Sequence, residues 1–248
     1  MGASSDDDCR DDDYRILESP SAERNKGPMY DVVLGPIVFP RLVDDALPRR
    51  RLRGSSGEED DGGRKKAVVR VLELAAGCGV HTTHFVSSFL ASSSSGGDHD
   101  DVGAGNDDDD DDVVVGVEWH PSDPDGEARA SIDARAIRAG LSSGRGVVVP
   151  AKPWALGRVG GTACRDGVRD KGDAGASRGG GMRRGDAGDY DGHLDYFDLA
   201  LCINMIHIAP WEATLGLMEC AGRVLRKGGL LVCYGPYKVG GTAAESNL

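Results

Sequence analysis

The chain has 248 residues, of which 37 are glycine, and it carries a formal net charge of −12 at pH 7. Only 39% of the residues are hydrophobic and 5% are aromatic, so we expect part of the chain to stay outside any packed core. It contains no apolar run of the ~18 residues that a membrane-spanning helix needs, and its acidic first residues fit neither a secretory signal nor a transit peptide. We therefore expect a cytoplasmic protein without a membrane partner.

Four charged or glycine-rich stretches carry most of the acidity. Residues 1–13, 49–66, 91–112 and 157–192 together account for −10 of the net charge. Because they lack the apolar side chains that offset the entropy of ordering a backbone, we expect a disordered acidic tail and three disordered insertions within one domain at 14–248. Acidic runs repel phosphate groups, which disfavours a nucleic-acid partner.

Buried strands and amphipathic helices alternate between these stretches. Strands are predicted at residues 68–74, 113–117, 146–149, 197–203 and 230–234, which are short runs of β-branched and other apolar residues. Helices are predicted at 81–90, from Ser122-Asp123-Pro124 onward, and from Pro210 to the Gly228-Gly229 pair. The sides expected to face the core contain Ala128, Ile132, Ala136 and Ile137 in the second helix and Leu215, Met218, Ala221 and Leu225 in the third.

Strands and helices that alternate in this way predict an α/β fold, a Rossmann-like parallel sheet with helices on both faces. In such sheets, ligands bind at the carboxyl ends of the strands, next to the point where the strand order reverses. Candidate functional residues should therefore follow the strands directly.

The first predicted strand runs into a glycine-rich turn, Glu73-Leu74-Ala75-Ala76-Gly77-Cys78-Gly79. Glycine lets the backbone approach a ligand closely and adopt turn dihedrals that other residues avoid. The dinucleotide pattern Gly-x-Gly-x-x-Gly needs glycine at position 82, where Thr82 stands, which disfavours an NAD-dependent dehydrogenase. A carboxylate beside the turn suits a ligand that carries an ammonium group better than it suits a pyrophosphate.

A metal site is not expected. The six cysteines contain no Cys-x-x-Cys pair, which disfavours a zinc cage or a thioredoxin-type site. His81 and His84 lie three residues apart on a predicted helix, but no third ligand is evident.

The turn resembles the first motif of class I S-adenosyl-L-methionine-dependent methyltransferases, acidic-x-Gly-x-Gly-x-Gly, with Ala75 in the first glycine slot. Four further blocks occur in the order SPSAERNKGP (19–28), WHPSDPD (119–125), CINMIHIAPWEAT (202–214) and GGLLVCYGPYKVGG (228–241). Together they are similar to the methyltransferase-like 26 family, also known as the DUF938 or UPF0585 proteins. The resemblance covers about residues 18–48, 67–90, 113–156 and 194–248. It implies S-adenosylmethionine as cofactor more firmly than it implies a reaction, because the family's own substrate is not established.

Two features depart from the family pattern. After the third predicted strand, VVVPAKPW at 147–154 stands where the family has a Leu-Asp-Val-like segment near the adenine, so no adenine contact is predicted. The chain also stops at Leu248, where the fold normally adds a helix and an antiparallel strand pair. We expect a truncated sheet that lacks the usual C-terminal strands and leaves an open edge.

The resemblance implies a role for each polar residue at the turn. Glu73 would bind the methionine ammonium, and Ala75, Gly77 and Gly79 would admit the cofactor to the backbone. Asp123 would accept hydrogen bonds from the two ribose hydroxyls; its alternative role is to cap the helix that begins at Pro124. Glu118, five residues earlier, is the rival acid.

Asn204 and His207 follow the fourth predicted strand and would face the methyl acceptor. Methyl transfer from a sulfonium is an in-line displacement that needs positioning, and it needs a base only where the acceptor must lose a proton. His207 is the candidate base, or else a structural histidine that bonds a loop carbonyl. Asn204 could bind either the cofactor or the acceptor.

Two functions from different classes remain. The first is a methyltransferase that uses S-adenosylmethionine and acts on a small-molecule acceptor. The second is a non-catalytic, methyltransferase-like binding or scaffold protein, which the altered segment after the third strand and the charged insertions favour.

Overall fold

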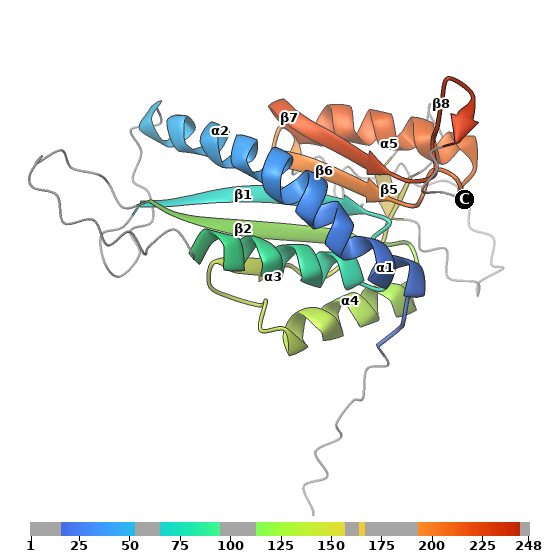
Figure 1. Ribbon diagram of the computed structural model, residues 1–248, viewed down its shortest axis with the longest axis horizontal. Helices are drawn as coiled ribbons and strands as arrows, with labels where there is room; N and C mark the ends of the chain where they lie inside the picture. Colours follow the sequence, from blue (N-terminus) through green and yellow to red (C-terminus); the bar gives the residue numbers. More distant parts are fainter. Residues whose placement is uncertain (1–15, 53–64, 95–112, 157–163, 167–192, 244–248) are drawn as a thin grey trace, which may run out of the picture.

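The computed structural model describes residues 16–52, 65–94, 113–156, 164–166 and 193–243 (Figure 1). The acidic tail and most of the three predicted insertions lie outside these residues. Where the structure reaches into the insertions, their ends are regular: helix α2 continues to Leu52, strand β1 begins at Lys65, and helix α3 continues to Ser94. Arginine and leucine continue a helix readily, and Lys65 pairs with Val113 of the next strand.

The core is a five-stranded, all-parallel sheet (Figure 1). Its strands are β1 (Lys65–Leu74), β2 (Val113–Ser122), β3 (Gly146–Val148), β6 (Phe197–Ile203) and β7 (Leu225–Tyr234), in the order β3-β2-β1-β6-β7. The order steps outward from β1 in both directions, so it reverses between β1 and β6. The predicted α/β parallel sheet is confirmed, and the reversal places a ligand-binding crevice at the carboxyl ends of these two strands.

Helices cover both faces of the sheet (Figure 1). On one face lie α3 (Val80–Ser94), α4 (Gly126–Arg138) and a nearly continuous helical stretch made of α1 (Pro20–Met29), η1 (Tyr30–Val38) and α2 (Phe39–Leu52). On the other face lies α5 (Trp211–Val224). No helix among the described residues is both long and apolar enough to cross a membrane.

Neighbouring residues of β1 belong to different core clusters. Val71 packs with Phe85 of α3 on one face, and Leu72 packs with Leu217 of α5 on the other. Because both faces are buried, the strands need continuous apolar runs rather than alternating ones, which is the pattern that the sequence shows.

The stretch from α1 to α2 is not anticipated by the sequence analysis. Pro28 and Pro36 stand inside it, and proline normally ends a helix. The π-helical η1 carries the chain past Pro36, and the buried side chains of Leu34 and Phe39 anchor the stretch to the sheet.

Two predicted helix ends are wrong. Helix α4 begins at Gly126 with Asp125 as its N-cap, because β2 continues through Ser122. Helix α5 ends at Val224, and the glycines at 228 and 229 lie within β7.

The predicted buried faces are partly wrong as well. Ile137 is 67% exposed, and Leu215 and Met218 are 40% and 49% exposed. The side of α5 that faces the sheet instead contains Thr214, Gly216, Leu217, Cys220, Ala221 and Val224. Small residues on that side let α5 approach the sheet closely, so hydrophobicity alone selects the wrong face.

Two short antiparallel pairs stand apart from the main sheet. They are β4 (Trp154–Leu156) with β5 (Cys164–Asp166), and β8 (Lys238–Val239) with β9 (Thr242–Ala243). Among the described residues, β7 is therefore an edge strand whose outer side carries no partner strand.

Candidate functional site

The glycine-rich turn after β1 is held in a left-handed conformation at three positions. Ala75, Gly77 and Gly79 have φ values of 55°, 59° and 84°. An added Cβ at Gly79 would lie 2.8 Å from the Cα of Ile132, whereas one at Gly77 would meet no atom within 4 Å. Gly79 is therefore required for packing of the turn on α4, while the backbone at Gly77 borders open space. Ala75 holds its conformation at a cost of ~1–2 kcal/mol.

Asp123, which follows β2, is tied directly to this turn. Its Oδ2 accepts a hydrogen bond from the Gly77 N–H at 2.9 Å, and its Oδ1 accepts one from the Asp125 N–H at 2.9 Å. Burial raises the pKa of Asp123, and these two bonds oppose the rise. A carboxylate has about four acceptor positions, so Asp123 retains the capacity to bind further hydroxyl donors.

The helix-capping alternative for Asp123 is wrong. The N-cap of α4 is Asp125, whose Oδ1 accepts from the N–H groups of Glu127 and Ala128. Because that position is filled, the side chain of Asp123 is left to hold the glycine turn.

Glu73 lies at the end of β1 and is completely buried. Its Oε2 accepts hydrogen bonds from Thr82 Oγ1 at 2.6 Å and from Trp119 Nε1 at 2.7 Å. Its Oε1 is buried as well and has no hydrogen-bond partner among the described residues. Burial raises the pKa of Glu73 to about 7, although both bonds to Oε2 lower it. A cation beside Oε1 would therefore convert a half-protonated acid into a carboxylate.

Thr82 explains why the turn differs from a dinucleotide fingerprint. It stands where that pattern needs its third glycine, and it is fully buried with its hydroxyl bonded to Glu73. The Thr82 side chain therefore fills the space that a pyrophosphate would need, and its hydroxyl holds the Glu73 carboxylate, which would repel a pyrophosphate.

The rival acid, Glu118, lies in the middle of β2 rather than at its end. Its Oε1 accepts from the Tyr196 hydroxyl at 2.8 Å and is paired with His120 Nε2. The bond to His120 lowers the pKa of Glu118 to about 2. Glu118 is therefore a carboxylate whose partners are His120 and Tyr196 rather than residues of the glycine turn.

Asn204 and His207 follow β6, as predicted, and lie beside the segment that follows β7. Asn204 is in a left-handed conformation, with φ at 55°, and its N–H donates to the Tyr234 carbonyl at 2.8 Å. His207 is exposed, and its Nδ1 lies 3.5 Å from the place that a Cβ on Gly235 would take. The structure thus brings these two residues to the carboxyl edge of the sheet.

Helix α1, whose polar segment from Glu23 to Lys26 the family resemblance predicts to fold over the pocket, contacts the glycine turn. Asn25 Oδ1 lies 2.8 Å from His81 Nε2, and Ala22 packs against Cys78 and Val80. Burial lowers the pKa of His81 to about 4, so the ring is neutral and can donate to Asn25. Within the part of the chain that the structure describes, no group of three or more His, Cys, Asp or Glu side chains could hold a metal ion.

Comparison with known proteins gives one family match. The family described as "Protein of unknown function (DUF938)" matches residues 185–248, which include β6, α5 and β7. This is the segment in which Asn204 and His207 lie.

Solved structures of similar arrangement include three proteins of low sequence identity. The PH0226 protein from Pyrococcus horikoshii OT3 is 13% identical, with 86% of this chain and 66% of that chain covered and a TM-score of 0.32. A proposed S-adenosyl-L-methionine-dependent methyltransferase from Methanococcus maripaludis is 12% identical, with 89% and 68% covered and a TM-score of 0.34. YjhP from E. coli is 15% identical, with 84% and 54% covered and a TM-score of 0.32. The chain thus spans between about half and two thirds of the lengths of these proteins, and likenesses of this size do not identify an activity.

Proposed function

We propose that the chain binds S-adenosylmethionine across the glycine turn and transfers its methyl group to a small molecule. On this proposal the chain is a class I methyltransferase, and the resemblance of its sequence blocks assigns it to the methyltransferase-like 26 family. The observation that carries the proposal is the hydrogen-bonded network at the carboxyl ends of β1 and β2, beside the reversal of strand order between β1 and β6. Two buried carboxylates, Glu73 and Asp123, come from the ends of neighbouring strands and flank one glycine turn.

The residues present fit such a ligand. The unpartnered Oε1 of Glu73 suits an ammonium group, and the spare acceptor capacity of Asp123 suits a pair of ribose hydroxyls. The open space beside Gly77 lets a nucleoside approach the backbone. The Thr82 side chain and the neighbouring acid make the same turn unsuited to a pyrophosphate.

The bound cofactor supplies a methyl group on a positively charged sulfur. The transfer forms a bond from the acceptor atom to the methyl carbon and breaks the sulfur–carbon bond, so the protein has to align the acceptor and exclude water. His207 would take the proton that a hydroxyl acceptor loses, and Asn204 would orient the acceptor or the cofactor. Both residues stand at the edge where such an acceptor would enter.

Calorimetric titration of the full chain with S-adenosylhomocysteine tests the cofactor site. The Glu73→Gln variant keeps an acceptor for Thr82 and Trp119 but loses the charge, so we expect its affinity to fall about tenfold or more. The control is Glu127→Gln, an exposed acid on α4, which should bind like the parent protein. Absence of binding by the parent protein, or equal affinity of the Glu73 variant, would contradict the proposal.

A non-catalytic binding protein is the second candidate, and one observation favours it. Ile208 and Trp211, close to His207 in the chain, are 77% and 66% exposed. Exposed apolar side chains often belong to contact surfaces for other proteins. The His207→Ala variant separates the two candidates: a methyltransferase loses methyl transfer into small-molecule extracts but keeps cofactor binding, whereas a scaffold protein shows no transfer in either form.

A further inference from the structure

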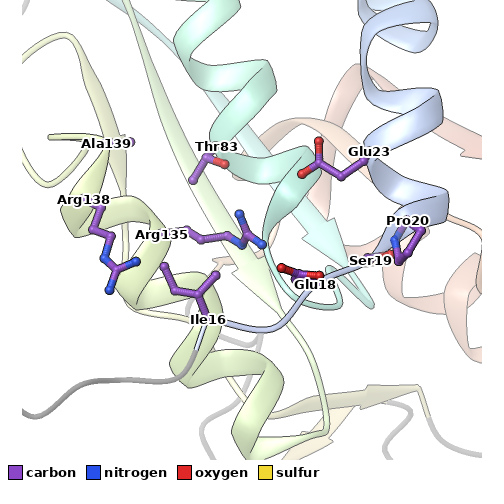
Figure 2. Close-up of a pocket in the computed structure, with 9 residues that line it drawn as sticks. All are labelled: Ile16, Glu18, Ser19, Pro20, Glu23, Thr83, Arg135, Arg138 and Ala139. Atoms are coloured by element: carbon purple, nitrogen blue, oxygen red, sulfur yellow. The ribbon is translucent and has the colours of Figure 1, made fainter.

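An open pocket of about 940 Å³ lies between the segment before α1, the first turn of α3 and the second half of α4 (Figure 2). The residues that matter for its chemistry are Glu18, Glu23, Thr83, Arg135 and Arg138. Its volume is typical of pockets that hold a small organic ligand.

The pocket is separate from the glycine-turn site, although the two share the start of α3. Thr82 turns its hydroxyl toward Glu73, whereas the next residue, Thr83, lines the pocket. Consecutive residues of an α-helix point about 100° apart, so α3 divides the two sites. Thr83 Oγ1 donates to the Gly79 carbonyl at 3.0 Å and remains able to accept a hydrogen bond.

One wall of the pocket is basic. Arg135 and Arg138 are three residues apart on α4, a spacing that places them on the same side of the helix. Figure 2 shows the Arg135 guanidinium between Thr83 and Glu18. Its Nη2 donates to the Leu17 carbonyl at 2.6 Å, while its buried Nε has no hydrogen-bond partner in the described part of the chain. A carboxylate oxygen placed there would satisfy a donor that the protein leaves unpaired.

The opposite wall is acidic. Glu18 precedes α1, and Glu23 lies in its first turn, where it is paired with Lys26. Two arginines thus face two glutamates, and because Glu23 is already paired with Lys26, Glu18 is the acid that is left to meet a cation of the ligand. A phosphate or a polyanion would meet the glutamates, and a simple amine would meet the arginines. Only a ligand with both charges satisfies both walls.

We propose that this pocket binds a small zwitterion of the α-amino acid type, with its carboxylate at Arg135 and Arg138 and its ammonium at Glu18. Ile16 and Pro20 also line the pocket, and they suit an aliphatic side chain on the ligand. The proposal is independent of the methyltransferase function, because none of these residues contacts Glu73 or Asp123.

Calorimetry with three probes of one carbon skeleton tests the charge requirement. L-leucine carries both charges, 4-methylpentanoate carries only the carboxylate, and 3-methylbutylamine carries only the ammonium. The full chain should bind leucine at least about tenfold more tightly than either partial analogue. Equal binding of all three probes, or no binding of leucine, overturns the proposal.

Two variants locate the binding. Arg138→Gln and Glu18→Gln change exposed residues, so they should leave the fold intact while each weakens leucine binding about tenfold. Arg41→Gln, an exposed arginine on α2, is the matched control and should bind leucine normally. Leucine binding that both pocket variants retain overturns the assignment to this pocket, whatever the titration with S-adenosylhomocysteine shows.

Discussion

At the ends of β1 and β2 the proposed site residues are buried and hydrogen-bonded, whereas after β6 Asn204 is half-buried and His207 is exposed. Glu73 and Asp123 are buried and each accepts two hydrogen bonds, and Asp123 holds the glycine turn itself. His207, by contrast, is exposed. The proposed cofactor residues, Glu73 and Asp123, therefore also stabilise the fold, whereas the proposed acceptor residue His207 does not. Substitutions of the cofactor residues should change stability together with binding, and substitutions of His207 should change activity alone.

The largest effect should come from Gly79→Ala. The new methyl group meets the backbone of Ile132 in a left-handed conformation, so we expect a loss of about 4 kcal/mol in the free energy of unfolding, measured in urea. Gly77→Ala is the matched control, with a similar φ but open space around it, and should lose only about 1 kcal/mol. Equal losses of unfolding free energy in the two variants would show that close packing of Gly79 against Ile132 of α4 does not limit the turn.

The pH dependence of stability tests the burial of Glu73. Its pKa is raised to about 7 in the folded protein from 4.5, so the folded state binds the extra proton between these values. Stability should therefore fall as the pH rises from about 4.5 through 7, by on the order of 3 kcal/mol from this group. Glu73→Gln should flatten this part of the profile of unfolding free energy against pH. A profile of the same slope in the variant would assign the dependence to other groups.

Asp123→Ala should lower the free energy of unfolding less than Gly79→Ala does, but it should also lower the affinity for the cofactor. The N–H groups of Gly77 and Asp125 lose their acceptor, which costs about 2 kcal/mol. Asp125→Ala provides the comparison, because it removes the N-cap of α4 at about 1 kcal/mol and leaves the turn in place. Only the first variant should lose affinity for S-adenosylhomocysteine in calorimetry; similar losses in both would point to α4 rather than to the turn.

The smallest effect on stability is expected for His207→Ala. The side chain is exposed, so the free energy of unfolding should change by less than about 0.5 kcal/mol. If His207 is the base, transfer to a hydroxyl acceptor should fall about 10²-fold or more, without a change in cofactor affinity. A variant of full activity would leave His207 a structural role only.

The sequence predicts the sheet well because every strand contains an apolar run, and in β6 this run is buried along its whole length. It also locates the glycine turn, since glycine adopts the positive φ values found at Gly77 and Gly79 at the lowest cost. What it does not predict depends on contacts between distant segments. The packing of the helical stretch with Pro28 and Pro36 is one case, and the bond from Asp123 to Gly77 across 46 positions is another.

The site residues also divide into those that the sequence predicts and those whose role depends on contacts between distant segments. Glu73 and Asp123 can be selected from their places after the strands, but the donors that hold Glu73 cannot. In the sequence, Thr82 is only a mismatch to the Gly-x-Gly-x-x-Gly pattern, and Trp119 has no feature that distinguishes it from a core residue. Their bonds to one carboxyl oxygen exist only once β2 and α3 are folded against β1.

The indole of Trp119 offers an optical consequence. It is completely buried, and its Nε1 donates to the one carboxyl group at the turn whose ionisation falls near neutral pH. Loss of the proton places a full negative charge 2.7 Å from the indole nitrogen, which shifts the tryptophan's absorption and emission. The chain has two further tryptophans, Trp154 and Trp211, so the part of the pH-dependent spectrum that Glu73→Gln removes is the part that reports the charge of this acid.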